Sequence, residues 1–218
     1  MDRERLMMPF RYSLMGDGAF DAVLLHPIDW LLRELAVPSF SGEWAELSFL
    51  RQPPETLETR VQAVLHYFPC DVLFIHRDAE RGTLEERRRE IKEVVGNLAN
   101  SCPVVCVVPV RMTEAWFLHD ERAIREAAGN PNGRKSISLP RIDRLESLPD
   151  PKRELSSLLV KATEATGRRQ TKRKQDLPKM RRRVAESIDD FEPLRELPAF
   201  QAFEQDLRRT ISSIDSAS

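Results

Sequence analysis

Two short, nearly continuous apolar runs constrain the fold of this chain more than any other feature. They read CDVLFIH over residues 70–76 and PVVCVVPV over residues 103–110, and both are rich in β-branched or aromatic side chains. A strand without polar alternation is buried on both faces, which is typical of a parallel sheet covered by helices. Amphipathic, charge-bearing segments separate such apolar runs, as in β-α units. The sequence therefore predicts an α/β fold with a central, mostly parallel sheet.

The same alternation of strand and helix extends back to the N-terminal region. Two further strands are predicted over residues 10–15 and 44–50, which gives a sheet of about four strands. Thr56 is placed to cap a helix, because two prolines precede it and an amphipathic run follows. The predicted helices of this region cover residues 21–35, 57–68, 83–98 and 111–129.

The second half of the chain has a different character. Residues 130–151 are rich in Pro, Asn and Gly and are predicted to form an ordered excursion or a joint between lobes. Helices are expected from Lys152 onward, with breaks over 167–178 and 189–198. We therefore expect an α/β core over residues 8–118 and a helical extension over 119–218 that packs on the core and offers a surface for a partner.

The composition excludes several classes of protein. Lys and Arg total 34 against 35 Asp and Glu, so binding to nucleic acid would need a local basic patch rather than net charge. Three cysteines without a CxxC pair favour a reducing compartment and argue against a disulfide framework or a zinc site. No signal peptide and no apolar segment long enough for a bilayer is recognisable. These features predict a cytoplasmic protein without a membrane partner.

Acidic side chains follow three of the predicted strands. The carboxyl ends of parallel strands meet at one edge of a sheet, so acids distant in sequence are expected to converge there. Asp78 and Glu80 are two residues apart on an extended segment and should point to the same side. Clustered carboxylates repel one another without a cation, and oxygen ligands suit Mg²⁺ or Mn²⁺. The acids in question are Asp17, Asp21, Asp78, Glu80 and Glu114.

Each of these positions also has a structural interpretation. Asp17 lies between two glycines, a context that also fits a turn residue or a helix cap. Asp78 and Glu80 fit a solvated loop with arginine partners, and Glu114 fits an acid in the first turn of a helix. His76, at the end of a predicted strand, is more typical of a strand-end residue that makes a hydrogen bond than of a catalytic base.

The order of these motifs resembles the TOPRIM domain of topoisomerases, primases and overcoming-lysogenization-defect (OLD) nucleases. The shared pattern is an acid after the first strand and an Asp-x-acid pair after a later one. Longer phrases resemble a bacterial TOPRIM-like family of unknown function over nearly the whole chain: GDGAFDAVLLHPIDWLL, CDVLFIHRDAER, PVVCVVPVRMTEAWFL, AAGNPNG, LPDPKREL and LPAFQAFEQDL. The resemblance implies a TOPRIM-like, Rossmann-like fold and metal-dependent phosphodiester chemistry. Members of the wider group resemble effector halves of phage-defence pairs, whose other half is an ABC-type or OLD-type ATPase.

The resemblance also implies roles for individual residues. Asp17 matches an acid, usually a glutamate, with general acid/base or metal duty. Asp78 matches the first metal-binding aspartate, and Glu80 stands where a second aspartate is usual. Asp21 matches an additional acid of OLD-like members, whereas Glu114 rests on its position after a strand. Asp17, Asp78 and Glu80 are therefore the expected catalytic residues, and all five acids are expected to bind Mg²⁺ or Mn²⁺.

Basic residues supply the expected contacts to substrate. Arg77, Arg81 and Arg111 lie beside the acids and would hold phosphate oxygens through bidentate contacts. The basic stretch over 167–183, which contains Lys172, Arg173 and Lys174, would hold a nucleic-acid backbone independently of sequence. Such a stretch is equally typical of a solvated helix face.

Two functions follow as hypotheses. The first is a metal-dependent nuclease effector that cleaves DNA or a structured RNA such as tRNA, in an anti-phage system with an ATPase partner. The second is a non-catalytic TOPRIM-like interaction or regulatory subunit of such a complex. A nucleotide-binding domain is disfavoured, because the chain has neither GxGxxG nor a Walker-type GK[ST] motif. The oligomeric state stays open, including a homo-oligomer.

Overall fold

The computed structural model describes residues 9–98 and 102–217. Within them the chain forms two compact units that interleave in sequence. The sheet unit contains residues up to Arg77, Leu84–Val108 and the chain from Ala202, and the helical unit contains Asp78–Thr83 and Pro109–Gln201. The predicted division into 8–118 and 119–218 stays a prediction, and its first residue lies outside the described ones.

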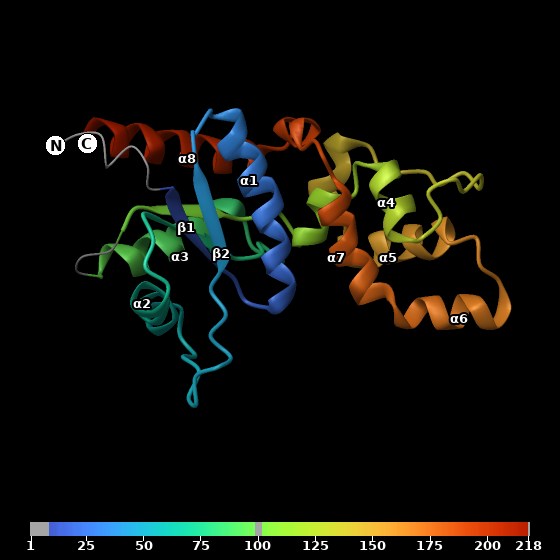
Figure 1. Cartoon of the computed structure of the whole chain (residues 1–218), viewed down its shortest axis with the longest axis horizontal. Coiled ribbons are helices and arrows are strands. Elements are labelled where there is room, and N and C mark those ends of the chain that lie inside the picture. Colours follow the sequence, from blue (N-terminus) through green and yellow to red (C-terminus); the bar gives the residue numbers. More distant parts are fainter. Residues whose placement is uncertain (1–8, 99–101, 218) are drawn as a thin grey trace. The chain divides into compact units, whose positions relative to one another are not determined.

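The sheet unit is built on a four-stranded, all-parallel sheet in the order β2-β1-β3-β4. This confirms the prediction of an α/β fold with a parallel sheet flanked by helices (Figure 1). The two apolar runs that dominate the sequence supply β3 and β4. The strands are β1 Phe10–Met15, β2 Phe40–Trp44, β3 Val72–His76 and β4 Val104–Val107.

The strand order reverses between β1 and β3. A 3-10 turn, η2 (Ala19–Leu24), and helix α1 (Leu25–Glu34) follow β1, and α1 packs on β2. Helices α2 (Leu57–Tyr67) and α3 (Leu84–Gly96) follow β2 and β3 and pack on each other. Tyr12 bonds to Asp29 of α1, whereas the next residue, Ser13, bonds to the backbone at the end of α2. Neighbouring strand residues face opposite ways, so α1 and α2 cover opposite faces.

Aromatic side chains fill the face of the sheet that α1 covers. The rings of Tyr12 and Phe74 meet edge to face with centroids 5.1 Å apart, and Phe74 meets Phe203 in the same way at 6.2 Å. Phe203 belongs to α8 (Pro198–Ala217), whose part from Ala202 onward lies in the sheet unit. Arg88 of α3 also holds α8, through Nη2 contacts of 2.8 and 2.7 Å to the two oxygens of Asp206. Helix α8 therefore contributes Phe203 to this core.

The position of β2 was predicted wrongly. The sequence predicts a strand over 44–50, but the strand ends at Trp44, where that segment begins. β2 lies at the sheet edge, and its three central residues are exposed, so it lacks the apolar pattern that marks β3 and β4. Its register pairs Gly42 with Tyr12.

The helical unit contains short helices joined by 3-10 turns. The single helix predicted over 111–129 is wrong, because it divides into a 3-10 turn and a helix at Asp120. The Asp120 carboxylate accepts a hydrogen bond from the backbone N–H of Ala123 at 3.0 Å, which caps the second piece. The elements are η3 Thr113–Phe117, α4 Glu121–Ala127, η4 Ile142–Ser147, α5 Pro151–Ala162, α6 Gly167–Gln175, α7 Leu177–Ser187 and η5 Glu192–Glu196.

The basic stretch is helical, contrary to the break predicted over 167–178. It forms α6, and the interruption is confined to Asp176, where α7 begins with a proline in its first turn. Arg, Lys and Gln are good helix formers, and proline is tolerated in the first turn of a helix. α6 buries none of its residues.

Candidate functional site

The turn after β1 is organised by the carboxylate of Asp21, which is only 8% exposed. Its Oδ2 accepts hydrogen bonds from the backbone N–H groups of Asp17 and Gly18, both at 2.9 Å. A Cβ at position 16 would lie 2.7 Å from this oxygen, so the close approach of the carboxylate requires Gly16. The Gly-Asp-Gly sequence thus wraps the backbone around a buried acid.

Asp17 points its carboxylate at two arginines. Its Oδ1 lies 2.7 Å from Arg60 Nη1, and its Oδ2 lies 2.9 Å from Arg77 Nε. Arg60 also donates to the Gly16 carbonyl, and Arg77 makes a second ion pair of 2.8 Å with Glu90. Two guanidinium groups therefore compensate the charge of Asp17 in the sheet unit.

His76 lies buried at the carboxyl end of β3, with 1% of its surface exposed. Its Nδ1–H donates to the carbonyl oxygen of Val107 on β4 at 3.0 Å. Its Nε2 lies 3.7 Å from Oδ1 of Asp21. Asp21 therefore contacts the turn after β1 with one oxygen and approaches the end of β3 with the other, next to the point where the strand order reverses.

The loops that follow β3 and β4 are bonded to each other within the helical unit. The backbone N–H of Ala79 donates to the Pro109 carbonyl at 3.1 Å, and that of Glu80 donates to the Arg111 carbonyl at 3.0 Å. Glu80 and Arg111 both have left-handed backbones, with φ of 52° and 69°. A non-glycine residue with a left-handed backbone is strained, and such strained residues are concentrated at functional sites. We call residues 78–80 and 109–114 the paired loops.

The paired loops carry three of the predicted acids. The Thr113 hydroxyl donates to Oδ1 of Asp78 at 3.1 Å, which fixes the orientation of that carboxylate. Glu114 is 4% exposed, and its Oε1 lies 3.9 Å from Nε of Arg181 on α7. Glu80 is exposed.

Both sets of acids are candidate ligands for a metal ion. Both oxygens of Asp17 are in ion pairs with arginines, so in this arrangement Asp17 does not need a cation to offset its charge. The paired loops carry Asp78 and Glu80, and Mg²⁺ is commonly held by one or two carboxylates together with water and substrate phosphates. Within residues 9–98 and 102–217, no three Asp, Glu, His or Cys side chains are gathered as a metal-binding group.

The predicted site residues divide between the two units. Asp17, Asp21 and Arg77 belong to the sheet unit, where the structure brings them together around the turn after β1. The other predicted acids and the remaining cations belong to the helical unit. Of these, Arg111 Nη1 lies 3.5 Å from the Glu80 carbonyl, whereas Arg81 and the three cations of α6 are exposed. Whether these residues bind metal or substrate stays a prediction.

Sequence reasoning missed Arg60, Thr113 and Arg181. Arg60 lies near the start of α2, and the helix after a parallel strand begins at the carboxyl edge of the sheet. Once the strand before α2 is known, that rule would place Arg60 near the carboxyl edge of the sheet, close to the predicted acids. No local pattern marks Thr113 or Arg181, because their partners are distant in sequence.

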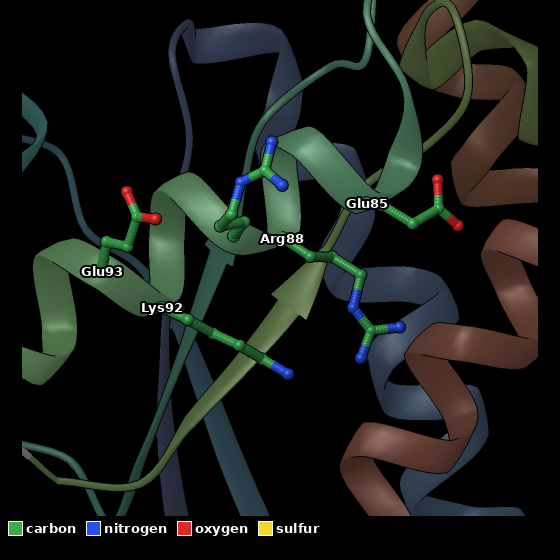
Figure 2. Close-up of a pocket in the computed structure, with 5 residues that line it drawn as sticks. Glu85, Arg88, Lys92 and Glu93 are labelled. Carbon is green, nitrogen blue, oxygen red and sulfur yellow. The ribbon is translucent and has the colours of Figure 1, made fainter.

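A shallow depression of about 480 Å³ lies on the surface of α3 (Figure 2). Its lining carries three cations and two acids, and Arg88 among them is already held by Asp206. The lining residues are Glu85, Arg88, Arg89, Lys92 and Glu93. None of the predicted site residues contributes to it, and its mixed charge favours no ligand class.

Comparison of this chain with known protein families, with curated proteins and with solved structures gives no match. The resemblance to TOPRIM proteins therefore rests on the sequence motifs alone. Among the described helices, none is both long enough and apolar enough to cross a membrane.

The turn after β1 makes a first testable prediction. Asp21→Ala should lower the free energy of unfolding by about 2 kcal/mol, because two backbone N–H groups lose their acceptor. Asp21→Asn is the matched control, since its amide oxygen can still accept, and it should cost about half as much. Urea unfolding followed by circular dichroism measures both. Equal stability of Asp21→Ala and the wild type would show that the hydrogen bonds from Asp17 and Gly18 to this carboxylate do not stabilise the fold.

Proposed function

We propose that this protein is a metal-dependent phosphodiesterase of the TOPRIM type, acting as a nuclease on DNA or on a structured RNA such as tRNA. The observation that carries the proposal is the strained pairing of Glu80 with Arg111, beside the carboxylate of Asp78. A left-handed backbone at a non-glycine residue costs free energy, and such residues cluster at active sites and ligand-binding sites. The motif resemblance supplies the reaction class.

In this proposal Asp78 and Glu80 hold the metal ion. When bound, Mg²⁺ or Mn²⁺ would lower the pKa of a bound water and neutralise charge on the scissile phosphate. Thr113 keeps Asp78 oriented through its 3.1 Å hydrogen bond, and the backbone pairing to Arg111 fixes Glu80. Arg81 and Arg111 would bind phosphate oxygens. The proposed role of Asp17 as a catalytic acid, and of Asp21 as a supporting acid, rests only on the resemblance to TOPRIM proteins.

Helix α6 is the proposed binding surface for nucleic acid. Its five cations, Arg168, Arg169, Lys172, Arg173 and Lys174, lie on a helix that buries none of its residues. Such a helix suits backbone phosphates without reading sequence. We further propose that the protein works in the cytoplasm and that an ABC-type or OLD-type ATPase restrains or delivers it in phage defence.

A second function is favoured by one observation. Asp17, which the resemblance makes a catalytic acid, has both carboxylate oxygens in ion pairs with Arg60 and Arg77. An acid held in this way stabilises a turn and has no need of a cation. The alternative is therefore a non-catalytic TOPRIM-like subunit that serves interaction or regulation within the same complex.

A cleavage assay separates the two functions. The purified protein, alone and with a co-expressed ATPase partner, is incubated with labelled plasmid DNA, single-stranded DNA and total tRNA in the presence of millimolar Mg²⁺ or Mn²⁺. Cleavage that appears with metal and disappears with EDTA is expected. Intact substrates in every combination, together with no detectable Mn²⁺ binding, would refute the nuclease and leave the regulatory subunit.

A further inference from the structure

Two cysteines of the sheet unit lie close enough to react with each other. Cys70 precedes β3 and Cys102 precedes β4, and these strands are parallel neighbours. The two Sγ atoms are 3.8 Å apart, and both residues are free thiols of intermediate exposure. A disulfide bond is about 2.05 Å long, so closure needs a sulfur displacement of about 2 Å, within reach of side-chain rotation. The sequence interpretation, which saw no disulfide pair, did not anticipate this proximity.

The surroundings shift the pKa values of the two thiols in opposite directions. The hydrogen bond between the two thiols, helped by Ser13, outweighs burial and lowers the pKa of Cys70 to about 7. The same bond, together with burial, raises the pKa of Cys102 above its ordinary value. Burial raises the pKa of Cys106, the third cysteine, to about 11. One thiol of the pair is therefore more readily ionised near neutral pH than an ordinary cysteine, while its neighbour stays protonated.

Both sulfurs of the pair belong to partly exposed residues. A depression of about 420 Å³ is lined by Cys102 and Cys106, together with other residues of α3 and β4. Cys70 itself is only partly buried, whereas Cys106 is 4% exposed. A low thiol pKa, partial exposure and a neighbouring thiol are the properties of a cysteine that is oxidised reversibly.

We propose that Cys70 and Cys102 form a reversible disulfide on exposure to hydrogen peroxide. The Cys70 thiolate attacks one peroxide oxygen, so an S–O bond forms, the O–O bond breaks and hydroxide leaves. The Cys102 sulfur then attacks the sulfenic sulfur, so the S–S bond forms, the S–O bond breaks and water leaves with the Cys102 proton. Two thiols and one peroxide thus give one disulfide and two waters, and a dithiol reductant reverses the change.

The bridge would connect the amino ends of β3 and β4. Asp17 and Asp21 follow the opposite, carboxyl end of β1, so the bridge leaves that turn unchanged. It closes the chain segment 70–102, and a closed loop restricts the unfolded chain. The oxidised protein should therefore resist urea better than the reduced one, whether or not it is a nuclease.

Thiol counting and mass spectrometry test the bridge in the full-length protein. Reduced protein is treated with hydrogen peroxide at pH 7, blocked with iodoacetamide and digested with trypsin. Cys70 falls in peptide 61–77, whereas Cys102 and Cys106 share peptide 93–111. Cys106→Ala therefore makes the assignment unambiguous. The expected results are a fall from three free thiols to one in the wild type and from two to none in Cys106→Ala, with peptides 61–77 and 93–111 linked until dithiothreitol is added.

Two serine variants serve as matched controls. Cys70→Ser and Cys102→Ser should each keep the reduced fold and form no intramolecular bridge under the same treatment. Oxidised wild type in which peptides 61–77 and 93–111 remain unlinked would overturn the inference. A link that forms equally in Cys102→Ser would also overturn it, because Cys106 would then be the partner.

Discussion

Asp78→Asn is expected to abolish the proposed metal-dependent cleavage while leaving the fold intact. An asparagine at this position still offers an oxygen to the Thr113 hydroxyl, so the paired loops should keep their geometry. It loses the negative charge that a hard divalent cation requires. Loss of even an indirect metal partner costs 10–100-fold, so loss of a ligand should cost about 100-fold or more in metal affinity and in cleavage rate.

Mn²⁺ titration by calorimetry measures this effect without a substrate or a partner. The matched control is Asp143→Asn, which removes one negative charge from an exposed ion pair with Arg141 in the same unit. The control should bind Mn²⁺ and cleave like the wild type. Unchanged Mn²⁺ affinity and cleavage in Asp78→Asn would exclude Asp78 as a ligand and, with it, the proposed mechanism.

The second large effect is expected at Gly42 in the edge strand β2. A Cβ at this position would overlap the ring of Tyr12, which is 1% exposed and is its register partner on β1. The ring cannot move away easily, because its hydroxyl donates to Asp29 Oδ1 at 2.5 Å and its edge packs on Phe74. Burial, followed by this hydrogen bond, raises the pKa of Tyr12, so the hydroxyl stays a donor at any ordinary pH.

Gly42→Ala should therefore lower the free energy of unfolding by about 3 kcal/mol, the upper end of the cost of overpacking a core. Gly96→Ala is the matched control, because a Cβ there meets no atom within 4 Å and the residue ends a helix. The control should be neutral or stabilising by up to about 1 kcal/mol. Urea unfolding measures both variants.

A double-mutant cycle identifies the clash. Combined with Tyr12→Ala, the Gly42→Ala change should cost much less than it does alone, because the ring that it overlaps is gone. Additive costs of the two substitutions would show that the destabilisation of Gly42→Ala has another origin, such as the strand backbone.

Several features of the fold were predictable because their causes are local. The apolar runs of β3 and β4 are buried on both faces, so their sequences show no alternation to confuse with a surface strand. Thr56 caps α2 as expected, and its hydroxyl accepts from the Thr59 N–H at 3.2 Å. Caps and buried runs depend on neighbours in sequence, which a reader of the sequence can see.

Other features depend on partners that the sequence does not show. β2 pairs at a sheet edge with three exposed residues, and only its neighbour β1 and the Tyr12 ring explain Gly42. The turn at Gly16 was singled out from its glycines, but the reason for it is a buried carboxylate at Asp21. At Gly42 the glycine reflects the close approach of a side chain from the neighbouring strand, whereas at Gly16 it reflects the approach of the Asp21 carboxylate from the same turn.

The candidate site shows the same division between local and tertiary causes. The sequence determined that acids follow the strands, because strand ends can be read from apolar runs. Only the tertiary structure decided that Asp17 meets two arginines, that Thr113 holds Asp78, and that Cys70 lies beside Cys102. These pairs join residues 32 to 60 positions apart in the chain, as Cys70 and Cys102 do at a separation of 32. The physical reason is that hydrogen bonds and ion pairs depend on distance in space, which strand order and register set.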